Sequence, residues 1–296
     1  MKIDICIVGH GKWGKIILEN ILLNKHFNLL ILITKQKVLK KNISKKTIVI
    51  SDYKKITKFK NVKAAFIATS PDKQIKISQF FLKNNISLIL EKPISTNIHS
   101  INKLIKINKI YKKLIIVNYI YLHHPLILHL QNKLLRSKEK IINIETIGGD
   151  NKPERKYIST LFDWGPHDLS ILLFFIKNPT INNINFEKRF RRINYEINFQ
   201  SKEKFISSIC FGNNFKSKTR KIKIFNNKNF YELNLISNNI FDQNNKKLKV
   251  KIVDSPLQNV LNYFYNNFKN KKIINRDLIF SKILTNILLK VHKKTV

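Results

Sequence analysis

The sequence predicts an α/β protein of two domains, the first built on a parallel sheet and the second an α+β domain with a large, mostly antiparallel open sheet. The chain has 296 residues, more than a single hydrophobic core usually organises. Strand and helix patterns alternate up to about residue 119, which is typical of βαβ units. Beyond that point, short strands with alternating polar and apolar residues follow one another. We therefore place the domains at residues 1–119 and 120–296.

The first domain is expected to contain strands of β-branched and apolar residues separated by amphipathic helices. The expected strands are residues 2–8, 28–34, 47–50, 64–69, 87–90 and 114–119. The expected helices are residues 12–24, 71–84 and 98–111. Alternation of this kind gives parallel strands whose two faces are both covered by helices.

The second domain is expected to be a series of strands joined by short Asn-, Lys- and Gly-rich turns. The expected strands are residues 140–147, 180–190, 194–200, 204–212, 218–225, 230–237 and 247–253. A helix over residues 162–176 is inserted near the start of the series, and helices over 256–268 and 276–292 end the chain. We expect the last helix to pack back on the first domain.

The chain carries a formal net charge of +38, which by itself would indicate a nucleic-acid or acidic-membrane partner. The charge comes almost entirely from lysine, whereas arginine is preferred for bidentate contacts to phosphates and bases. The lysines are spread along the whole chain, and Lys, Ile and Asn are abundant together, as expected of an A/T-rich gene. We attribute the charge to composition and expect no specific nucleic-acid partner, although weak, salt-sensitive polyanion binding follows from charge alone.

The expected location is the reducing cytoplasm, with no membrane partner. The two cysteines, Cys6 and Cys210, cannot form a disulfide framework, and neither stands in metal-ligand spacing. The first residues reach a Gly-rich turn too soon to contain the apolar region of a signal peptide. No apolar run approaches the roughly 20 residues that span a bilayer.

The motif "GHGKWG" lies between the first strand and the first helix and has the G-x-G-x-x-G spacing of a dinucleotide-binding turn. Gly9 permits the tight turn, Gly11 lets the backbone approach a pyrophosphate, and Gly14 allows close helix–strand packing. Lys12 and Trp13 lie within the motif, at the helix N-terminus that would face the phosphates. In this context the motif predicts a Rossmann dinucleotide-binding domain, although a purely structural Gly turn is the alternative.

The choice between NADP and NAD rests on the end of the second strand. An acidic residue there would bind the 2′-hydroxyl of NAD, but the sequence reads Thr34, Lys35, Gln36, Lys37. A hydroxyl and lysines suit a 2′-phosphate better, which favours NADP. General lysine excess explains the same residues, so both cofactors remain candidates.

The stretch "ATSPDKQ" closes the fourth strand and opens a helix. Small residues at Ala68, Thr69 and Ser70 would let the nicotinamide-ribose part of a cofactor come close. Pro71 suits the first helical turn, and Gln74 follows one turn later. The same stretch is also an ordinary helix start.

The stretch "SLILEKPISTN" delivers Glu91, Lys92 and Pro93 at the end of a buried strand. Ligands of open parallel sheets bind outside the carboxyl ends of the strands, so Lys92 would face the nicotinamide end of the cleft. Pro93 restricts the conformation of Lys92, which would hold its ammonium in place. A surface lysine is the alternative in so lysine-rich a chain.

The stretch "FDWGPHDLS" carries Asp163 and His167 at i, i+4 spacing, so both lie on one face of a helix that begins near Asp163. A carboxylate beside an imidazole that titrates near neutral pH suits proton transfer in hydroxyl-to-carbonyl chemistry. The alternative is an N-capping Asp163 with a half-buried structural His167. His123 and His124 have no further ligands at useful spacing, so we predict loop residues and no metal site.

In chain order, "GHGKWG", "AAFIATSPDKQ", "LILEKPISTN", "VNY" followed by "HHP", "DWGPHDLS" and "SPLQNVLNYF" resemble the Gfo/Idh/MocA oxidoreductase family, which includes relatives of glucose–fructose oxidoreductase and inositol dehydrogenase. The resemblance spans almost the whole chain, and E-K-P together with D-x-x-x-H is its specific part. It implies a Rossmann domain, an α/β domain with a large open sheet, NAD or NADP, and reversible oxidation of sugar or cyclitol hydroxyls.

The resemblance also implies roles for three residues. Lys92 would orient the reacting hydroxyl and stabilise developing alkoxide charge, His167 would be the general acid/base, and Asp163 would position the substrate. Gln74 stands where many relatives have His, and Ser170 where an acidic residue is frequent. The stretch "IYLHHP" lacks an arginine common in relatives, and these differences leave the substrate open.

The favoured prediction is an NAD(P)-dependent oxidoreductase acting on a secondary hydroxyl or carbonyl of a sugar, nucleotide sugar or cyclitol. A non-catalytic dinucleotide-binding sensor or assembly protein of the same fold is the alternative, and a nucleic-acid binder is a third hypothesis. A broad sheet with helices on one face needs a partner for the other, so we expect a homodimer or tetramer that pairs open sheets.

Overall fold

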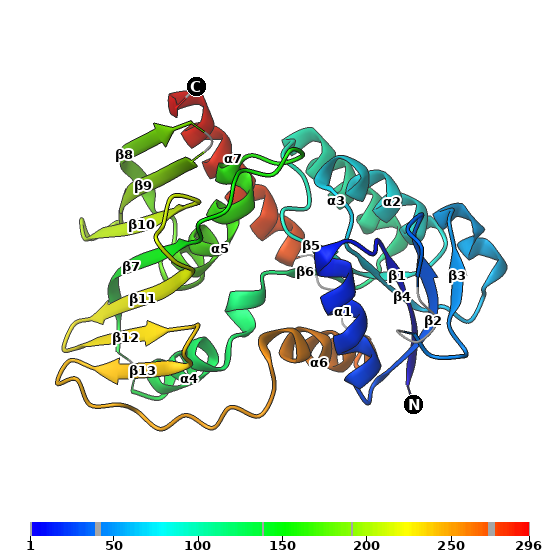
Figure 1. Cartoon of the computed structure of the whole chain (residues 1–296). Helices are drawn as coiled ribbons and strands as arrows, with labels where there is room; N and C mark the ends of the chain where they lie inside the picture. Colours follow the sequence, from blue (N-terminus) through cyan, green and yellow to red (C-terminus); the bar gives the residue numbers. More distant parts are fainter. Residues whose placement is uncertain (1, 39–42, 138, 191, 272–275, 296) are drawn as a thin grey trace. The chain divides into compact units, whose positions relative to one another are not determined.

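The computed structural model describes residues 2–38, 43–137, 139–190, 192–271 and 276–295. The chain divides into two compact units (Figure 1). The first consists of Met1–Asn118 and Leu257–Thr285, and the second of Tyr119–Pro256 and Asn286–Val296. The segment Leu257–Thr285, which the sequence analysis placed in the second domain, groups with the first unit.

The first unit is built on a six-stranded parallel sheet of order β3-β2-β1-β4-β5-β6. Its strands are β1 (Ile3–Val8), β2 (Phe27–Ile33), β3 (Ile48–Ile50), β4 (Ala64–Ile67), β5 (Ser87–Glu91) and β6 (Ile115–Asn118). Its helices are α1 (Lys12–Leu23), the 3₁₀ helix η2 (Tyr53–Lys58), α2 (Pro71–Lys83), α3 (Ile98–Tyr111), nearly all of α6 (Pro256–Lys269) and the first half of α7 (Arg276–Thr295). This strand order is that of the doubly wound dinucleotide-binding fold, as predicted.

Helices cover both faces of this sheet, which is why its strands are continuous apolar runs. Every residue of β4 is buried, and so is every residue of β5. Figure 1 shows α2 and α3 on one side of the sheet and α1 and α6 on the other. The α6 contact is polar as well as apolar: Asn24 donates a hydrogen bond to Gln258 at 2.6 Å, and the rings of His26 and Tyr265 stack at 3.9 Å.

The second unit is built on a seven-stranded mixed sheet of order β13-β12-β11-β7-β10-β9-β8. Its strands are β7 (Ile141–Gly149), β8 (Thr180–Arg189), β9 (Arg192–Gln200), β10 (Ile206–Gly212), β11 (Thr219–Asn226), β12 (Phe230–Asn234) and β13 (Asn239–Asp242). Among the strand pairs that the described residues form in this sheet, β7–β10 is parallel and the others are antiparallel. The helices η3 (Ile120–His123), α4 (Pro125–Ser137), α5 (Thr160–Phe175) and the end of α7 complete the unit. The predicted α+β domain with a mostly antiparallel sheet is confirmed.

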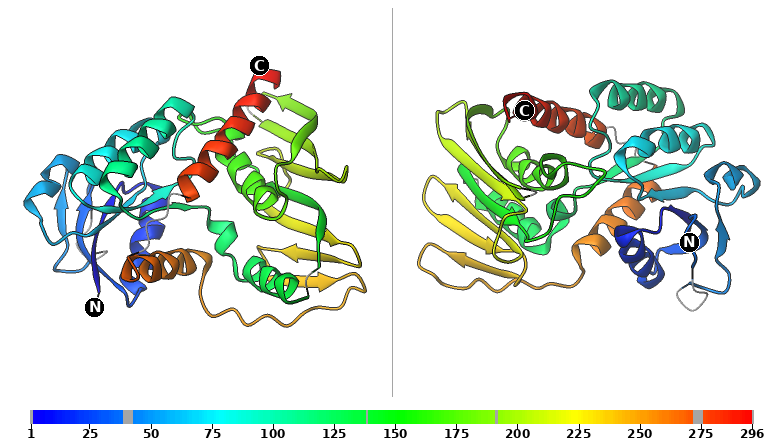
Figure 2. Two further views of the ribbon diagram at one scale, coloured as in Figure 1. Left: turned by 180° about the vertical axis from the view of Figure 1, so that it is seen from behind. Right: turned by 45° about the horizontal axis from the view of Figure 1, so that its top comes forward.

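The two faces of this sheet differ. Along β9 every second residue is buried, beginning with Ile193 and ending with Phe199, and the residues between them are polar. α5 lies along the buried face in all three ribbon views (Figures 1 and 2). Among the described residues, the opposite face carries no helix of this unit, so that face of the sheet is open.

One predicted strand is absent, and the helix α4 and the strand β13 were missed. Residues 247–253 do not form a strand: they are exposed or half-buried, and only Lys247 makes an isolated bridge, to Phe241. The last strand is β13, and residues 247–253 instead belong to the connection that leads from the sheet to α6. The helix α4 was not predicted, although Leu126, Ile127, Leu130 and Leu134 form its buried stripe.

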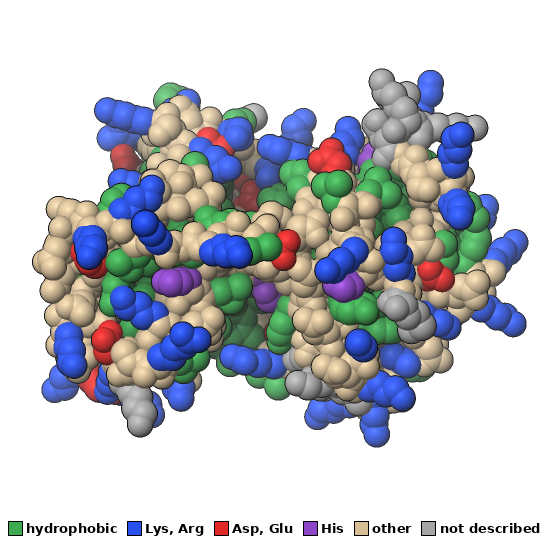
Figure 3. Space-filling view, turned by 90° about the horizontal axis from the view of Figure 1, so that it is seen from below, with side chains coloured by type: hydrophobic (Ala, Val, Ile, Leu, Met, Phe, Trp, Pro, Cys, Tyr) green, Lys and Arg blue, Asp and Glu red, His purple; other side chains and the backbone are tan. Residues whose placement is uncertain are grey.

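Lys and Arg side chains are scattered over the visible face of the molecule and do not gather in one stripe (Figure 3). Within the described part of the chain, no helix combines the length and apolar character needed to cross a membrane.

Candidate functional site

The turn between β1 and α1 is packed against the end of β4. Gly9 has φ +103°, and a Cβ built on it would lie 2.4 Å from the carbonyl oxygen of Ala68. A Cβ on Gly14 would lie 2.3 Å from the carbonyl oxygen of Gly9, whereas a Cβ on Gly11 meets nothing within 4 Å. The first and third glycines thus permit close backbone approach, and Gly11 borders open space, as the fingerprint requires.

The residues at this edge of the sheet fit a bound dinucleotide. Gly11 is the N-cap residue of α1, so the N–H groups of the first turn are available to phosphate oxygens. Lys12 and Trp13 are the first two residues of α1, with Lys12 exposed. Two buried polar atoms, Nδ1 of His10 and Oγ1 of Thr69, make no hydrogen bond with any described residue. Polar groups in such positions are candidates to bind a cofactor.

The end of β2 is where a cofactor ribose would be recognised. The Thr34 hydroxyl accepts a hydrogen bond from the N–H of Gln36 at 3.0 Å, and Lys35 is exposed. No acidic side chain occupies positions 34–38. Beyond the end of β4, which lies on the other side of β1, Ser70 is the N-cap residue of α2 and Pro71 occupies the first turn of that helix.

The loop that carries Lys92 is fixed from both sides. The buried side-chain amide of Gln74 donates hydrogen bonds to the carbonyl oxygens of Glu91 at 2.8 Å and Pro93 at 3.1 Å. The Glu91 carboxylate accepts a hydrogen bond from the amide of Asn118, at the end of β6, at 2.5 Å. The Lys92–Pro93 peptide bond is cis. The residue that departs from many relatives, Gln74, is therefore the one that holds the Lys92 backbone.

Asp163 and His167 lie on the first half of α5, as their spacing predicted. The helix begins at Thr160 with Ser159 as its N-cap, so the alternative of an N-capping Asp163 is wrong. Asp163 forms an ion pair with Arg155 at 3.2 Å. His167 is 8% exposed, and its ring meets the ring of Tyr121 edge to face with centroids 4.9 Å apart. Lys92 belongs to the first unit, and Asp163 and His167 belong to the second.

The sequence did not predict a buried ion pair next to His167. Asp168 accepts a hydrogen bond from Nη1 of Arg220 at 2.6 Å, and both side chains are almost completely buried. The sequence pattern could have indicated it. Arg220 stands two and four positions before the apolar Ile222 and Ile224 on β11, so its side chain lies on the same, buried face of the sheet.

The two adjacent histidines are ordered parts of the second unit. His124 is buried; its Nδ1 accepts the N–H of Leu126 and its Nε2 lies 3.2 Å from the carbonyl oxygen of Leu235. Burial lowers the pKa of His124. The described residues contain no group of three or more His, Cys, Asp or Glu side chains arranged to hold a metal ion.

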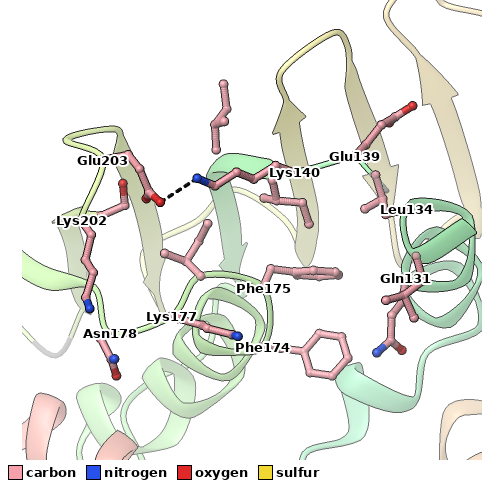
Figure 4. A pocket seen from close by; sticks show the side chains of 15 residues that line it. Gln131, Leu134, Glu139, Lys140, Phe174, Phe175, Lys177, Asn178, Lys202 and Glu203 are labelled. Carbon is pink, nitrogen blue, oxygen red and sulfur yellow. Dashed lines mark hydrogen bonds and ion pairs between the residues drawn. The ribbon is translucent and has the colours of Figure 1, made fainter. Parts of the chain in front are cut away.

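A cavity of about 540 Å³ opens in the second unit away from the predicted site residues (Figure 4). Its apolar side is formed by residues of α4 and α5, including Leu134, Phe174 and Phe175. At its rim Lys140 and Glu203 form an ion pair at 2.7 Å. None of the predicted catalytic or cofactor-binding residues lines it.

The sheet order, the glycine turn and the buried polar atoms at its edge together define the first unit as a dinucleotide-binding Rossmann domain. Residues 3–119 match the model of the Gfo/Idh/MocA family, described as an oxidoreductase family with an NAD-binding Rossmann fold. The predicted resemblance to this family is thereby confirmed over residues 3–119. No curated protein matches the sequence.

Solved structures share the fold of the whole chain at low sequence identity. A dehydrogenase from Chromobacterium violaceum is 12% identical with a TM-score of 0.87, over 99% of this chain and 95% of that one. UDP-N-acetylglucosamine 3-dehydrogenase GnnA from Acidithiobacillus ferrooxidans is 13% identical with a TM-score of 0.83, over 98% and 97% of the two chains. Levoglucosan dehydrogenase in complex with NADH is 10% identical with a TM-score of 0.83, over 99% and 96%.

Proposed function

We propose that the protein is an NAD(P)-dependent dehydrogenase or reductase that transfers a hydride between the nicotinamide and a secondary hydroxyl or carbonyl carbon of a sugar, nucleotide sugar or cyclitol. The observation that carries this proposal is the fixed Lys92 loop. Gln74 and Asn118 hold this loop at the carboxyl end of β5, in a sheet whose glycine turn fits a dinucleotide. A lysine held at that edge is placed to act on a ligand bound outside the sheet.

Each of the three proposed catalytic residues has a distinct role. The cofactor, when bound, accepts or supplies the hydride. In the oxidative direction the Lys92 ammonium stabilises negative charge on the substrate oxygen, and the imidazole of His167 takes the hydroxyl proton. Asp163, already restrained by Arg155, accepts a hydrogen bond from a second substrate hydroxyl and orients the ring. In the reductive direction, His167 returns the proton to the oxygen.

The substrate class and the cofactor are supported by two kinds of observation. GnnA acts by its name on UDP-N-acetylglucosamine, and levoglucosan dehydrogenase has been solved with NADH and L-sorbose. In this chain Thr34 and Lys35, with no acidic side chain at positions 34–38, favour the 2′-phosphate of NADP. The levoglucosan dehydrogenase structure contains NADH, so NAD is the second candidate. We propose a cytoplasmic location and a homo-oligomer formed through the open face of the second sheet.

The test is a pair of titrations followed by a substrate screen. NADH and NADPH are titrated separately while nicotinamide fluorescence is recorded. Sugars, nucleotide sugars and cyclitols are then screened for a substrate-dependent change in the absorbance band of the reduced nicotinamide. Turnover with at least one class supports the proposal. Tight cofactor binding without turnover for any class would favour a non-catalytic dinucleotide-binding sensor, and no binding of either cofactor would overturn both.

A further inference from the structure

A buried ion pair in the second unit has no role in the chemistry proposed above. Arg220 is 2% exposed and Asp168 is 0% exposed, and their side chains meet at 2.6 Å. Placing two charges in the interior is costly, and apolar residues of similar volume often serve stability equally well. The pair therefore calls for an explanation other than stability.

The fold makes room for the guanidinium. In the register of β7 and β11, Arg220 lies directly opposite Gly148. A Cβ on Gly148 would lie 2.1 Å from Nη1 and 2.2 Å from Cζ of Arg220. Any side chain at residue 148 would thus displace the guanidinium from its present place.

Both side chains of this pair, Arg220 and Asp168, are charged. Arginine does not lose its proton in proteins, so a buried guanidinium needs a counter-charge. Burial lowers and the Asp168 carboxylate raises the pKa of Arg220, and the net shift is upward. Burial raises the pKa of Asp168, and Arg220 opposes that shift. Nη1 donates to Asp168, the Cζ atom of Arg220 lies near the rings of Tyr121 and Trp164, and the side chain of Tyr121 also contributes to raising the pKa of Arg220.

Those rings connect the pair to His167. The Cζ atom of Arg220 lies 4.7 Å from the ring centroid of Tyr121 and 5.7 Å from that of Trp164. Tyr121 in turn meets the imidazole of His167 edge to face, at 4.9 Å and an interplanar angle of 74°. Asp168 is the next residue after His167 on α5. Tyr121 thus lies against both the Arg220 guanidinium and the His167 imidazole, and Asp168 adjoins His167 in the chain.

We propose that Asp168, Arg220 and Tyr121 are positioning residues for His167: the ion pair fixes the Tyr121 ring, and that ring fixes the imidazole in the orientation required for proton transfer. This proposal rests on the role assigned to His167 in the proposed function. The alternative is an ion pair that only fills the core.

The experiment separates these alternatives with three variants. Tyr121→Phe keeps the ring, Tyr121→Leu removes it, and the double change Asp168→Leu with Arg220→Met replaces both charges by apolar side chains. Phe230→Leu is the control, because it removes a ring that also carries a cation, Lys223 at 4.0 Å, from another part of the same sheet. For each protein, kcat, KM and the pH profile are measured, and the His167 imidazole is followed by NMR in ¹³C-histidine-labelled protein.

We expect Tyr121→Leu and the double variant to lower kcat by about 10- to 100-fold, since small misplacements of a catalytic group cost that much. KM should change little, the pH profile should move, and the His167 signal should shift and broaden. Phe230→Leu should resemble the unmodified protein, whereas Tyr121→Phe should show a smaller loss than Tyr121→Leu, because it keeps the ring and loses the hydroxyl that interacts with Arg220. The proposal would be overturned if Tyr121→Leu kept the kcat, the pH profile and the His167 signal of the unmodified protein. This outcome does not depend on whether the double variant folds. If no substrate is turned over, the proposed function fails, and the NMR signal alone decides whether Tyr121 holds His167.

Discussion

The side-chain amide of Gln74 donates a hydrogen bond to the backbone carbonyl oxygen of Glu91 at 2.8 Å, and a second one to the carbonyl of Pro93 at 3.1 Å. The two carbonyls flank Lys92, so one buried amide from α2 fixes the backbone of this residue on both sides. Glu91 is fixed further by Asn118. The Lys92 backbone is therefore preorganised by side chains from two other elements, which is what a residue that acts on a bound ligand requires.

Gln74→Ala should reduce turnover although Lys92 is unchanged. The two carbonyls lose their donor, so the Lys92 backbone gains freedom and kcat should fall by about 10- to 100-fold. Unmet buried acceptors should also lower the free energy of unfolding by about 1–3 kcal/mol. Gln79→Ala is the matched control on α2, because the Nε2 of Gln79 makes no hydrogen bond with any described residue. Equal kinetics in the two variants would show that Gln74 does not position Lys92.

Lys92→Ala should nearly abolish turnover and leave cofactor affinity largely intact. In the proposed role the ammonium stabilises charge on the substrate oxygen, a contribution on the order of 10² to 10³ in rate, whereas the dinucleotide would be held mainly by the glycine turn. The measurements are steady-state kinetics and titration by nicotinamide fluorescence. Lys83→Ala, an exposed lysine at the end of α2, controls for the loss of one positive charge. Parallel loss of turnover and cofactor binding would contradict the assigned role.

Gly11→Ala and Gly9→Ala should fail in different ways. An added methyl group on Gly11 meets nothing within 4 Å, so the fold should tolerate it, but it would enter the space where a pyrophosphate approaches. Gly9→Ala combines a positive φ with a Cβ 2.4 Å from the carbonyl of Ala68, so it should destabilise the domain. Thermal unfolding and cofactor titration distinguish the two. Unchanged cofactor affinity in Gly11→Ala would argue against a dinucleotide at this turn.

Local patterns in the sequence predicted most of the fold. The alternation of strands and helices gave the parallel sheet, because each strand is a continuous apolar run between two helix signals. The prediction of a strand over residues 247–253 was wrong. Alternating polar and apolar residues show that a segment has two unlike faces, but they do not show that a neighbouring strand is available to pair with it. The buried stripe of α4, beginning at Leu126 and ending at Leu134, has helical spacing and could have been recognised.

The site was predictable as a set of residue types and not as a set of contacts. The glycine turn and the placement of Asp163 and His167 on one helix follow from spacing alone. The hydrogen bonds from Gln74 to the Lys92 loop join residues 17 and 19 positions apart and depend on how α2 packs on β5. The ion pair of Asp168 and Arg220 joins residues 52 positions apart and depends on how α5 packs on the sheet.

Association through the open face of the second sheet should depend on salt. Outward positions on β7 and β11 include Ile147, which is 44% exposed, and the charged Glu145 and Lys221. Copies of a chain with a net charge of +38 repel one another, so raising the ionic strength should favour the oligomer. Sedimentation at micromolar concentration tests this, and Ile147→Glu should weaken association. A monomer at every salt concentration would refute the proposed homo-oligomer.

Asp277 should make the stability of the first unit depend on pH. Its carboxylate, in the first turn of α7, accepts the N–H of Val117 at 2.9 Å, and burial raises its pKa from 3.8 to about 6. The folded state therefore binds this proton more tightly than the unfolded chain does. The stability that the group contributes is complete below about pH 4 and is lost as the pH rises through 6. The total loss is about 3 kcal/mol of unfolding free energy.

Asp277→Asn removes this titration and keeps an oxygen that can accept the Val117 N–H. The variant should therefore gain stability relative to the unmodified protein as the pH rises, by roughly 1–2 kcal/mol between pH 5 and 7.5. Denaturant unfolding at several pH values measures the difference, in which the titration of all other groups cancels. Asp72→Asn, at the exposed first turn of α2, controls for the loss of a carboxylate near a helix N-terminus. The stability difference between Asp277→Asn and the unmodified protein could instead stay constant across this pH range. That result would mean that Asp277 is already ionised in the folded state and that its hydrogen bond to Val117 offsets the cost of burial.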